Sequence, residues 1–163
     1  MSLYGGSRDI NLIKSLNREI IGNIIEQQVG YYKPKLDETN INLYGEGINK
    51  TWIGPVLIQC LISRGKYEWK TDELGPDTKR IFEFRFLKDH LVDANVVPEV
   101  GDALLYNEDY FEVNGVDQNQ FILGKDPDYS YSDSVQNFGA SLSIILTAHY
   151  SRAEKLGIKQ DRL

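Results

Sequence analysis

The spacing of apolar residues changes along the chain and predicts a helix first and strands afterwards. Within Ile10–Val29 apolar residues recur every three to four positions, the period of one face of an α-helix. The members of this stripe are Ile10, Ile13, Leu16, Ile20, Ile21, Ile24, Ile25 and Val29. Ser7 or Asp9 is the expected N-cap, and Gly30 is the expected left-handed residue at the helix end.

The segment Gly30–Lys50 shows little periodicity and contains Pro34, Gly45 and Gly47. A connection of this length is usually functional when it belongs to a compact domain. We therefore expect either a plain surface loop or an arm that becomes ordered against a neighbouring subunit. Met1–Tyr4 is expected to form a mobile arm before the helix.

After Trp52 the period becomes two, which is typical of strands. The clearest case is Lys79–Leu87, where Phe82, Phe84 and Phe86 fall on one face and alternate with Ile81, Glu83, Arg85 and Leu87. Further strands are predicted at Ile53–Ser63, Lys66–Lys70, Asp102–Tyr106, Tyr110–Val116, Gln120–Lys125 and Ser141–Tyr150. Turns or loops are predicted at Leu74–Asp77, Asn107–Asp109 and Asp126–Gly139, and a helical turn at Ala153–Leu156.

Together these elements predict a mainly β fold: a small antiparallel β-barrel or sandwich with one N-terminal α-helix and extended loops or an arm. We divide the chain into residues 1–50, holding the arm, the helix and the extended connection, and residues 51–163, holding the β-barrel domain and a short C-terminal tail. A chain of 163 residues is long enough to bury one core.

Charge and cysteine content narrow the functional classes. The net charge is −6, and Leu91–Tyr150 contains ten acidic residues with Lys125 as its single base. Such an acidic block grips nucleic acid poorly, because phosphate binding needs concentrated Lys and Arg. It is either a solvated face or, in a ring around DNA, a surface that repels phosphate. The single cysteine, Cys60, excludes an intramolecular disulfide, and its apolar neighbours predict a buried thiol.

The sequence also lacks the marks of export and of membrane insertion. Its first residues have neither the basic start nor the apolar run of a signal peptide. No apolar run reaches the roughly 18 residues that a bilayer span needs. We expect a cytosolic product.

No motif predicts a catalytic, cofactor or metal site. His90 and His149 stand outside any metal-ligand spacing, and both are expected to be structural or surface residues. Gly45–Gly47 begins like a dinucleotide fingerprint but lacks its third glycine and a preceding strand. Asp126–Asp128 with Asp133 suggests calcium, although the glycine and the final glutamate of an EF-hand loop are missing. There is neither a GxSxG elbow nor a phosphate-binding loop.

The order of short motifs in the C-terminal half carries a family resemblance. Val97–Tyr106 reads V-P-E-V-G-D followed by A-L-L-Y, Tyr110–Asn114 reads Y-F-E-V-N, and Gln120–Gly124 reads Q-F-I-L-G. Ser143–Tyr150 follows as a further strand. This set resembles the neck, or head-completion, proteins of T-even-like contractile-tailed phages and their marine relatives. The chain is shorter than those proteins and lacks their long C-terminal extension.

The resemblance implies a non-enzymatic virion protein of the phage neck, which assembles in the host cytoplasm. It would be a β-barrel subunit of a ring that completes the DNA-filled head and accepts the tail. The implied partners are further copies of itself in a ring of six, a portal-side adaptor or connector protein and the tail-terminator protein. Packaged double-stranded DNA would lie in non-specific proximity, and no membrane would be involved.

Aromatic residues on predicted loops are the candidate interface residues, because large aromatic side chains often dominate interfaces. They are Tyr31, Tyr32, Tyr129, Tyr131 and Phe138. Two other functions stay open: a tail-terminator or tail-tube ring protein, and a small ligand-binding or carbohydrate-binding β-barrel. Tyr67 and Trp69 are the one hint of a carbohydrate platform, but alternate residues of a strand face opposite sides. A hydrolytic enzyme is the least supported class.

Overall fold

The computed structural model describes residues 7–35, 40–41, 47–65, 68–72, 75–118 and 142–158. The helical elements are α1 (Ser7–Glu19), the π-helical turn η1 (Ile20–Ile25), α2 (Lys88–Asp93) and α3 (Ala153–Leu156). The first strands are β1 (Gln28–Pro34), β2 (Asn40–Ile41), β3 (Gly47–Asn49), β4 (Trp52–Gln59), β5 (Leu61–Arg64) and β6 (Glu68–Asp72). The later ones are β7 (Gly75–Lys79), β8 (Ile81–Leu87), β9 (Ala103–Tyr106), β10 (Asp109–Asp117) and β11 (Ser143–Ser151).

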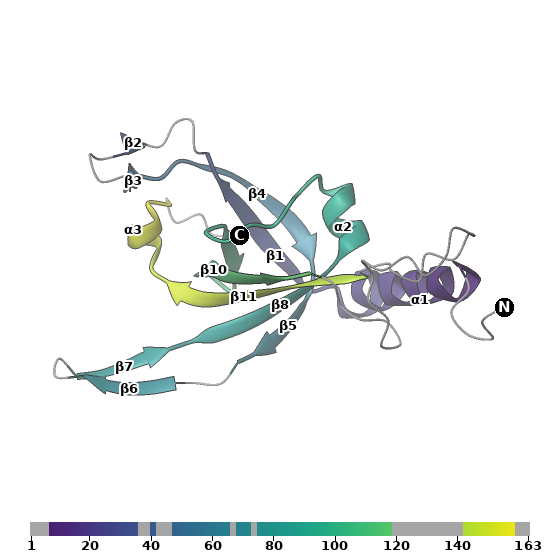
Figure 1. Ribbon diagram of the computed structural model, residues 1–163, viewed down its shortest axis with the longest axis horizontal. Coiled ribbons are helices and arrows are strands. Elements are labelled where there is room, and N and C mark those ends of the chain that lie inside the picture. Colours follow the sequence, from purple (N-terminus) through teal and green to yellow (C-terminus); the bar gives the residue numbers. More distant parts are fainter. Residues whose placement is uncertain are drawn as a thin grey trace, which may run out of the picture.

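The main structure is a seven-stranded antiparallel sheet in the order β4-β1-β9-β10-β11-β8-β5, which confirms the mainly β prediction. The sheet is not closed into a barrel. Its edge strands β4 and β5 are nevertheless consecutive in sequence and separated by Cys60 alone. The Cys60 N–H donates to the carbonyl of Gln27 at 2.9 Å. In Figure 1 the β1–β4 flank and the β5–β8 flank diverge from a common end beside α1.

The inner face of the sheet holds the main core, and β8 supplies its aromatic centre. Phe84 and Phe86 are fully buried and Phe82 nearly so, whereas Arg85 is exposed, which confirms the predicted alternation. The ring of Phe111 on β10 lies 4.8 Å from that of Phe82 and 5.6 Å from that of Phe84, centroid to centroid. Such tilted aromatic pairs stabilise beyond the area they bury.

A second, smaller core covers the opposite face at the far end of the sheet. Its buried members are Tyr32, Ala103, Leu105, Tyr110 and Leu156. The short helix α3, which coincides with the predicted turn at Ala153–Leu156, packs Leu156 against it. The indole N–H of Trp52 donates to the carbonyl of Leu156 at 2.8 Å and so holds α3 over the sheet.

The segment after the helix differs from the prediction. The helix ends at Ile25 rather than Val29, and the left-handed residue that ends it is Glu26 (φ 51°) rather than Gly30. Gly30 instead lies in β1, which pairs with both β4 and β9. Because neighbouring strands and both cores cover β1, its residues show no polar–apolar alternation, and the segment resembles a loop in sequence. The sheet therefore takes one strand from the predicted N-terminal region.

Three smaller differences concern the strands and one new helix. The predicted strand Ile53–Ser63 is interrupted at Cys60. The predicted turn Leu74–Asp77 is shorter, because Gly75 already pairs with Asp72 in the β6–β7 hairpin, which projects from the body of the molecule (Figure 1). Helix α2 was not foreseen, since six residues are too few to show a helical period.

The predicted hairpin across Asn107–Asp109 is confirmed as β9–β10, although Asp109 already belongs to β10. Asn107 and Glu108 both have positive φ, at 51° and 67°, as a type I′ turn requires. The predicted arm Met1–Tyr4, strand Gln120–Lys125 and loop Asp126–Gly139 lie outside the described residues.

Candidate functional site

The N-terminal helix exposes most of its apolar stripe, although Ile21 of η1 is buried. The exposed large apolar side chains of α1 and η1 are Leu12, Ile13, Leu16, Ile20, Ile24 and Ile25, and we call this set the apolar ridge. Leu16 is 48% exposed and Ile24 is 71% exposed. Figure 1 shows α1 extending beyond the end of the sheet. The sequence predicted a helix here, although with a later end, and a surface helix normally turns such a stripe toward its own core.

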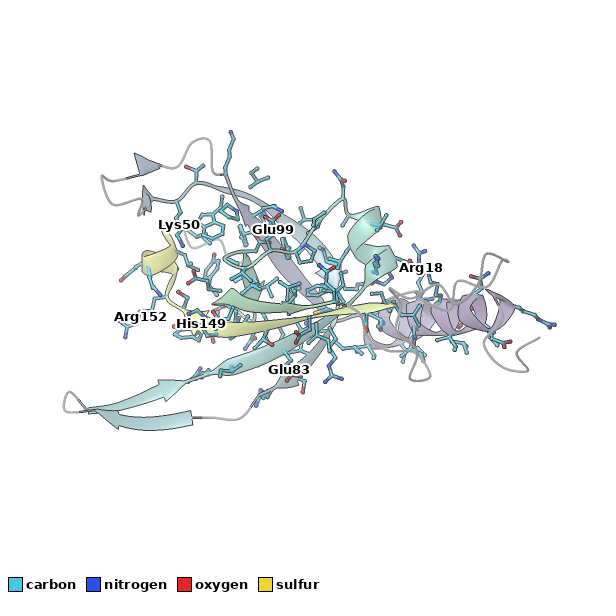
Figure 2. All side chains as sticks on the ribbon, viewed as in Figure 1. Arg18, Lys50, Glu83, Glu99, His149 and Arg152 are labelled. Atoms are coloured by element: carbon cyan, nitrogen blue, oxygen red, sulfur yellow. The ribbon has the colours of Figure 1, made fainter. Side chains whose placement is uncertain are left out.

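Ion pairs hold the helix in this inverted orientation. The Lys14 ammonium lies 3.2 Å from the Asp89 carboxylate, and the Arg18 guanidinium lies 2.6 Å from that of Asp93. Each pair of like residues is four positions apart, so both bases share one face of α1 and both acids share one face of α2. Figure 2 shows Arg18 between these two helices.

The rest of the polar face of the helix lines a groove against the body. This groove has a volume of about 740 Å³. From the helix it is lined by Ser15, Arg18, Glu19, Gly22 and Asn23, and from the body by polar and apolar residues of β1, β4 and α2 and by Ala94. The Gln59 amide donates to the carbonyl of Gly22 at 3.1 Å. The body therefore contacts the helix through these polar groups and through the buried Ile21, and the ridge lies on the exposed side.

The ridge is large for the surface of a single chain. The exposed fractions of its six members add up to about three whole side chains. That corresponds to roughly 500 Å² of apolar surface, near the upper end of the largest patch on a typical monomer. Patches of this size usually mark an interaction site.

A second apolar surface lies on the other side of α2. A cleft of about 290 Å³ opens between β4 and the segment that follows α2, and we call it the β4 cleft. It is lined by Tyr31, Lys33, Ile53, Val56, Ala94, Asn95, Val96 and Val97. At its rim Ile53 is 54% exposed and Val97 is 65% exposed. The Lys33 ammonium donates to the carbonyl of Val97 at 2.9 Å and thereby fixes that wall.

A buried carboxyl anchors the same wall from below. Asp102 is 1% exposed and accepts hydrogen bonds from the Tyr31 hydroxyl and from the Glu99 backbone N–H, the latter at 2.8 Å. Burial raises the pKa of Asp102, although the Tyr31 and Glu99 hydrogen bonds favour the ionised form. Burial and the neighbouring Asp102 raise the pKa of Tyr31, so its hydroxyl keeps the proton that it donates. The V-P-E-V-G-D motif thus ends in a residue that locks the cleft wall in place.

Most described acids of the predicted acidic block are engaged within the chain. Asp93 pairs with Arg18, Glu99 with Lys33 and Asp109 with Arg80, while Asp102 binds Tyr31. Glu112 lies within 4 Å of Lys50, His149 and Lys155. Figure 2 shows Lys50 and His149 at this end of the molecule, close to α3. The lysines and arginines among these bases come from outside the block and offset its charge, so its described part is not a bare acidic face.

Two of the five candidate interface aromatics lie in the described structure, and both are buried. Tyr31 and Tyr32 lie on β1 with exposures of 1% and 3%, and their predicted location on a loop is wrong. Tyr31 faces the main core and Tyr32 faces the second core, so neither ring is available to a partner at the surface. Tyr129, Tyr131 and Phe138 lie outside the described residues. The hint of a carbohydrate platform at Tyr67 also falls outside them.

Groups that often mark catalytic or metal sites have structural surroundings here. Cys60 is fully buried, as predicted, and burial raises the pKa of its thiol to about 12, which keeps it in the unreactive thiol form. Over the described ranges, no three or more His, Cys, Asp or Glu residues gather closely enough to hold a metal ion. In the same part of the chain, no helix has the length and apolar character needed to cross a membrane.

Comparison of the whole sequence with protein-family models and with curated proteins found no match. The ridge and the β4 cleft are therefore the features on which a functional proposal can be built. The sequence stripe signalled the ridge, whereas the two ion pairs on the opposite side of the helix join segments that are far apart in the chain. The cleft had no sequence signal, because its walls are far apart in the chain.

Proposed function

We propose that this chain is a structural subunit of the neck of a contractile-tailed phage, where a ring of copies completes the DNA-filled head and accepts the tail. The observation that carries the proposal is the apolar ridge, which intrachain ion pairs hold away from the body. Permanent assemblies bury apolar surfaces of this kind between subunits.

The resemblance to neck proteins supplies the identity of the assembly. Of the residues that carry it, Val97 lines the β4 cleft, and Ala103–Tyr106 with Tyr110–Asn114 lie in the hairpin β9–β10. These residues belong to the ordered sheet and its flanking wall, as expected of a protein with a structural role. The proposed partners are other copies of the chain, the portal-side adaptor and the tail-terminator protein, with packaged DNA close by.

The experiment is to measure the molar mass of the purified chain by light scattering, alone and mixed with the adaptor and the tail-terminator protein. We expect a ring of six copies on at least one of these partners, and none with an unrelated carrier protein of similar size. A chain that stays monomeric with every partner would contradict the proposal and favour the ligand-binding alternative. Labelled chains found at the tail tube rather than between head and tail would favour the tail-tube alternative.

A further inference from the structure

We infer that the free edge of β4 accepts an extended peptide of a partner protein, which adds to the sheet as a further strand and carries a basic side chain. The site is the groove of about 740 Å³ between the polar face of α1 and the body, and we call it the helix groove. The inference goes beyond the proposed function, because it rests on this groove and on the sheet edge beside it.

The two edges of the sheet differ in how well they are protected against pairing. β5 is four residues long and ends in the exposed residues Ser63 and Arg64. β4 is eight residues long, none of them charged, and Leu57 is 54% exposed. Short length, charged side chains, proline and bulges protect an edge strand from a further strand. In β4 the protection is Pro55 with its adjoining bulge, which leaves Val56–Gln59 open.

The helix groove follows this open part of the edge. Leu57, Ile58 and Gln59 all line it. Because consecutive residues of a strand face opposite sides, a groove that all three residues line reaches round the edge of the strand. β4 is the terminal strand of the sheet and pairs with β1 on its other side. Alternate residues of β4 therefore direct backbone N–H and C=O groups toward the groove.

The dimensions of the groove suit a short extended peptide. Four residues of β4 span about 13 Å, since a strand rises roughly 3.3 Å per residue. The volume of the groove lies within the roughly 300–1,000 Å³ of typical ligand sites. The Gln59 amide donates to the Gly22 carbonyl at 3.1 Å, so η1 lies against one end. A peptide bound by strand addition gains affinity from main-chain hydrogen bonds, so it needs no deep apolar pocket.

The charged lining of the groove favours a basic residue in the peptide. It consists of one arginine, Arg18, and two acids, Glu19 and Asp93. Arg18 and Asp93 pair with each other at 2.6 Å, whereas Glu19 has no ion pair in the described part of the chain. Glu19 is exposed, so a Lys or Arg of the partner would gain a modest attraction from it.

The test begins with a library of seven-residue peptides with blocked ends and a central lysine, selected on the full chain. Leu57→Lys places a charge at the edge inside the groove. Ile53→Lys is the matched control, because Ile53 lies on the same strand, is also 54% exposed and does not line the groove. Thermal unfolding establishes that both variants fold.

Isothermal titration calorimetry measures the affinity of the selected peptides. They should bind Leu57→Lys at least tenfold more weakly than the wild type and Ile53→Lys with unchanged affinity. Glu19→Gln should weaken binding by about two- to fivefold, as expected for an exposed ion pair. Glu154→Gln, at an exposed acid of α3, should leave the affinity unchanged.

Methylation of the peptide backbone tests the strand geometry on the wild-type chain, independently of any variant. Only alternate residues of an added strand direct their N–H groups at the neighbouring strand. N-methylation of one alternate set of residues should therefore weaken binding at least tenfold, whereas N-methylation of the other set should leave most of it.

Three results would overturn the inference. The first is a selection that yields no binding peptide. The second is binding to Leu57→Lys at wild-type strength, and the third is an equal loss of affinity with both methylated sets. None of these results bears on the proposed function, because ring formation on the adaptor and the tail-terminator protein is measured by light scattering without any peptide.

Discussion

Strand β8 and helix α1 are the two most regular amphipathic segments of this chain, and they treat their apolar faces in opposite ways. On β8, Phe84 and Phe86 are fully buried. On α1, Leu12 and Leu16 are about half exposed. The regular spacing predicted both elements, although the helix ends four residues before its predicted end. Such spacing predicts that the apolar face of an element will be buried. It does not show whether residues of the same chain or another molecule will bury it.

The difference arises from what each element meets on its apolar side. The inner face of β8 meets Phe111 and the rest of the main core, to which β1, β4, β9, β10, β11 and α2 contribute. The side of α1 that faces the body meets Asp89 and Asp93 of α2. A charged contact selects the polar face of a helix, since burying an ionised group against apolar side chains would leave its charge uncompensated.

The largest expected effect is on the buried face. Phe84→Ala should lower the free energy of unfolding by about 3–5 kcal/mol, because it leaves a cavity among packed aromatic rings. Leu16→Ala, measured by urea denaturation at a concentration where the chain is monomeric, should change it by less than about 0.5 kcal/mol. Equal losses for the two substitutions would show that the ridge belongs to the core of the single chain, and the contrast between the segments would fail.

An intermediate effect is expected at the cleft wall. Tyr31→Phe removes the hydroxyl that donates to the buried carboxyl of Asp102 and should lower the free energy of unfolding by about 1–3 kcal/mol. Tyr106→Phe is the matched control, because Tyr106 is a partly buried tyrosine packed at the same core. A loss as large at Tyr106 as at Tyr31 would show that the hydrogen bond to Asp102 adds nothing.

The same carboxyl should make stability depend on pH in a defined direction. Because burial raises the pKa of Asp102, the folded chain holds a proton that the unfolded chain has already released as pH rises past the ordinary range of Asp. The free energy of unfolding of the wild type, relative to that of Asp102→Asn, should therefore fall as pH rises from the ordinary pKa of Asp to the raised pKa in the folded chain. Above the raised pKa the difference should level off. Urea unfolding at a series of pH values measures this difference, and a rise with pH would contradict the assignment.

The smallest effect is expected at the ion pairs. Replacing both Lys14 and Arg18 with Ala should lower the free energy of unfolding by no more than about 1 kcal/mol for each pair, since both pairs are partly exposed. It should nevertheless speed amide hydrogen exchange in α1, and added salt should reduce the difference from wild type. Arg85→Ala, which breaks the Arg85–Glu83 pair within β8, is the control and should leave α1 unchanged.

The sequence was most informative where an element has one exposed face or stands next to a clear turn. Strand β8, the hairpin β9–β10 and the turn at α3 were predicted close to their observed bounds because apolar spacing or turn chemistry marks them. Strand β1 was missed because cores on both faces cover it, so Tyr31 and Tyr32 resemble loop aromatics in sequence. The β4 cleft could not be foreseen, since long-range pairing brings its walls together.

The pairing pattern of the strands also determines how late in translation the sheet can be completed. Gly30 of β1 pairs with Leu105 of β9, and Phe84 of β8 pairs with Leu146 of β11. At a translation rate of about 5–20 residues per second, β9 is synthesised several seconds after β1, with which it pairs. The sheet cannot be complete until β11 has been synthesised. The ridge is translated before any of these strands. It is therefore available to other proteins while the body that will turn it outward does not yet exist.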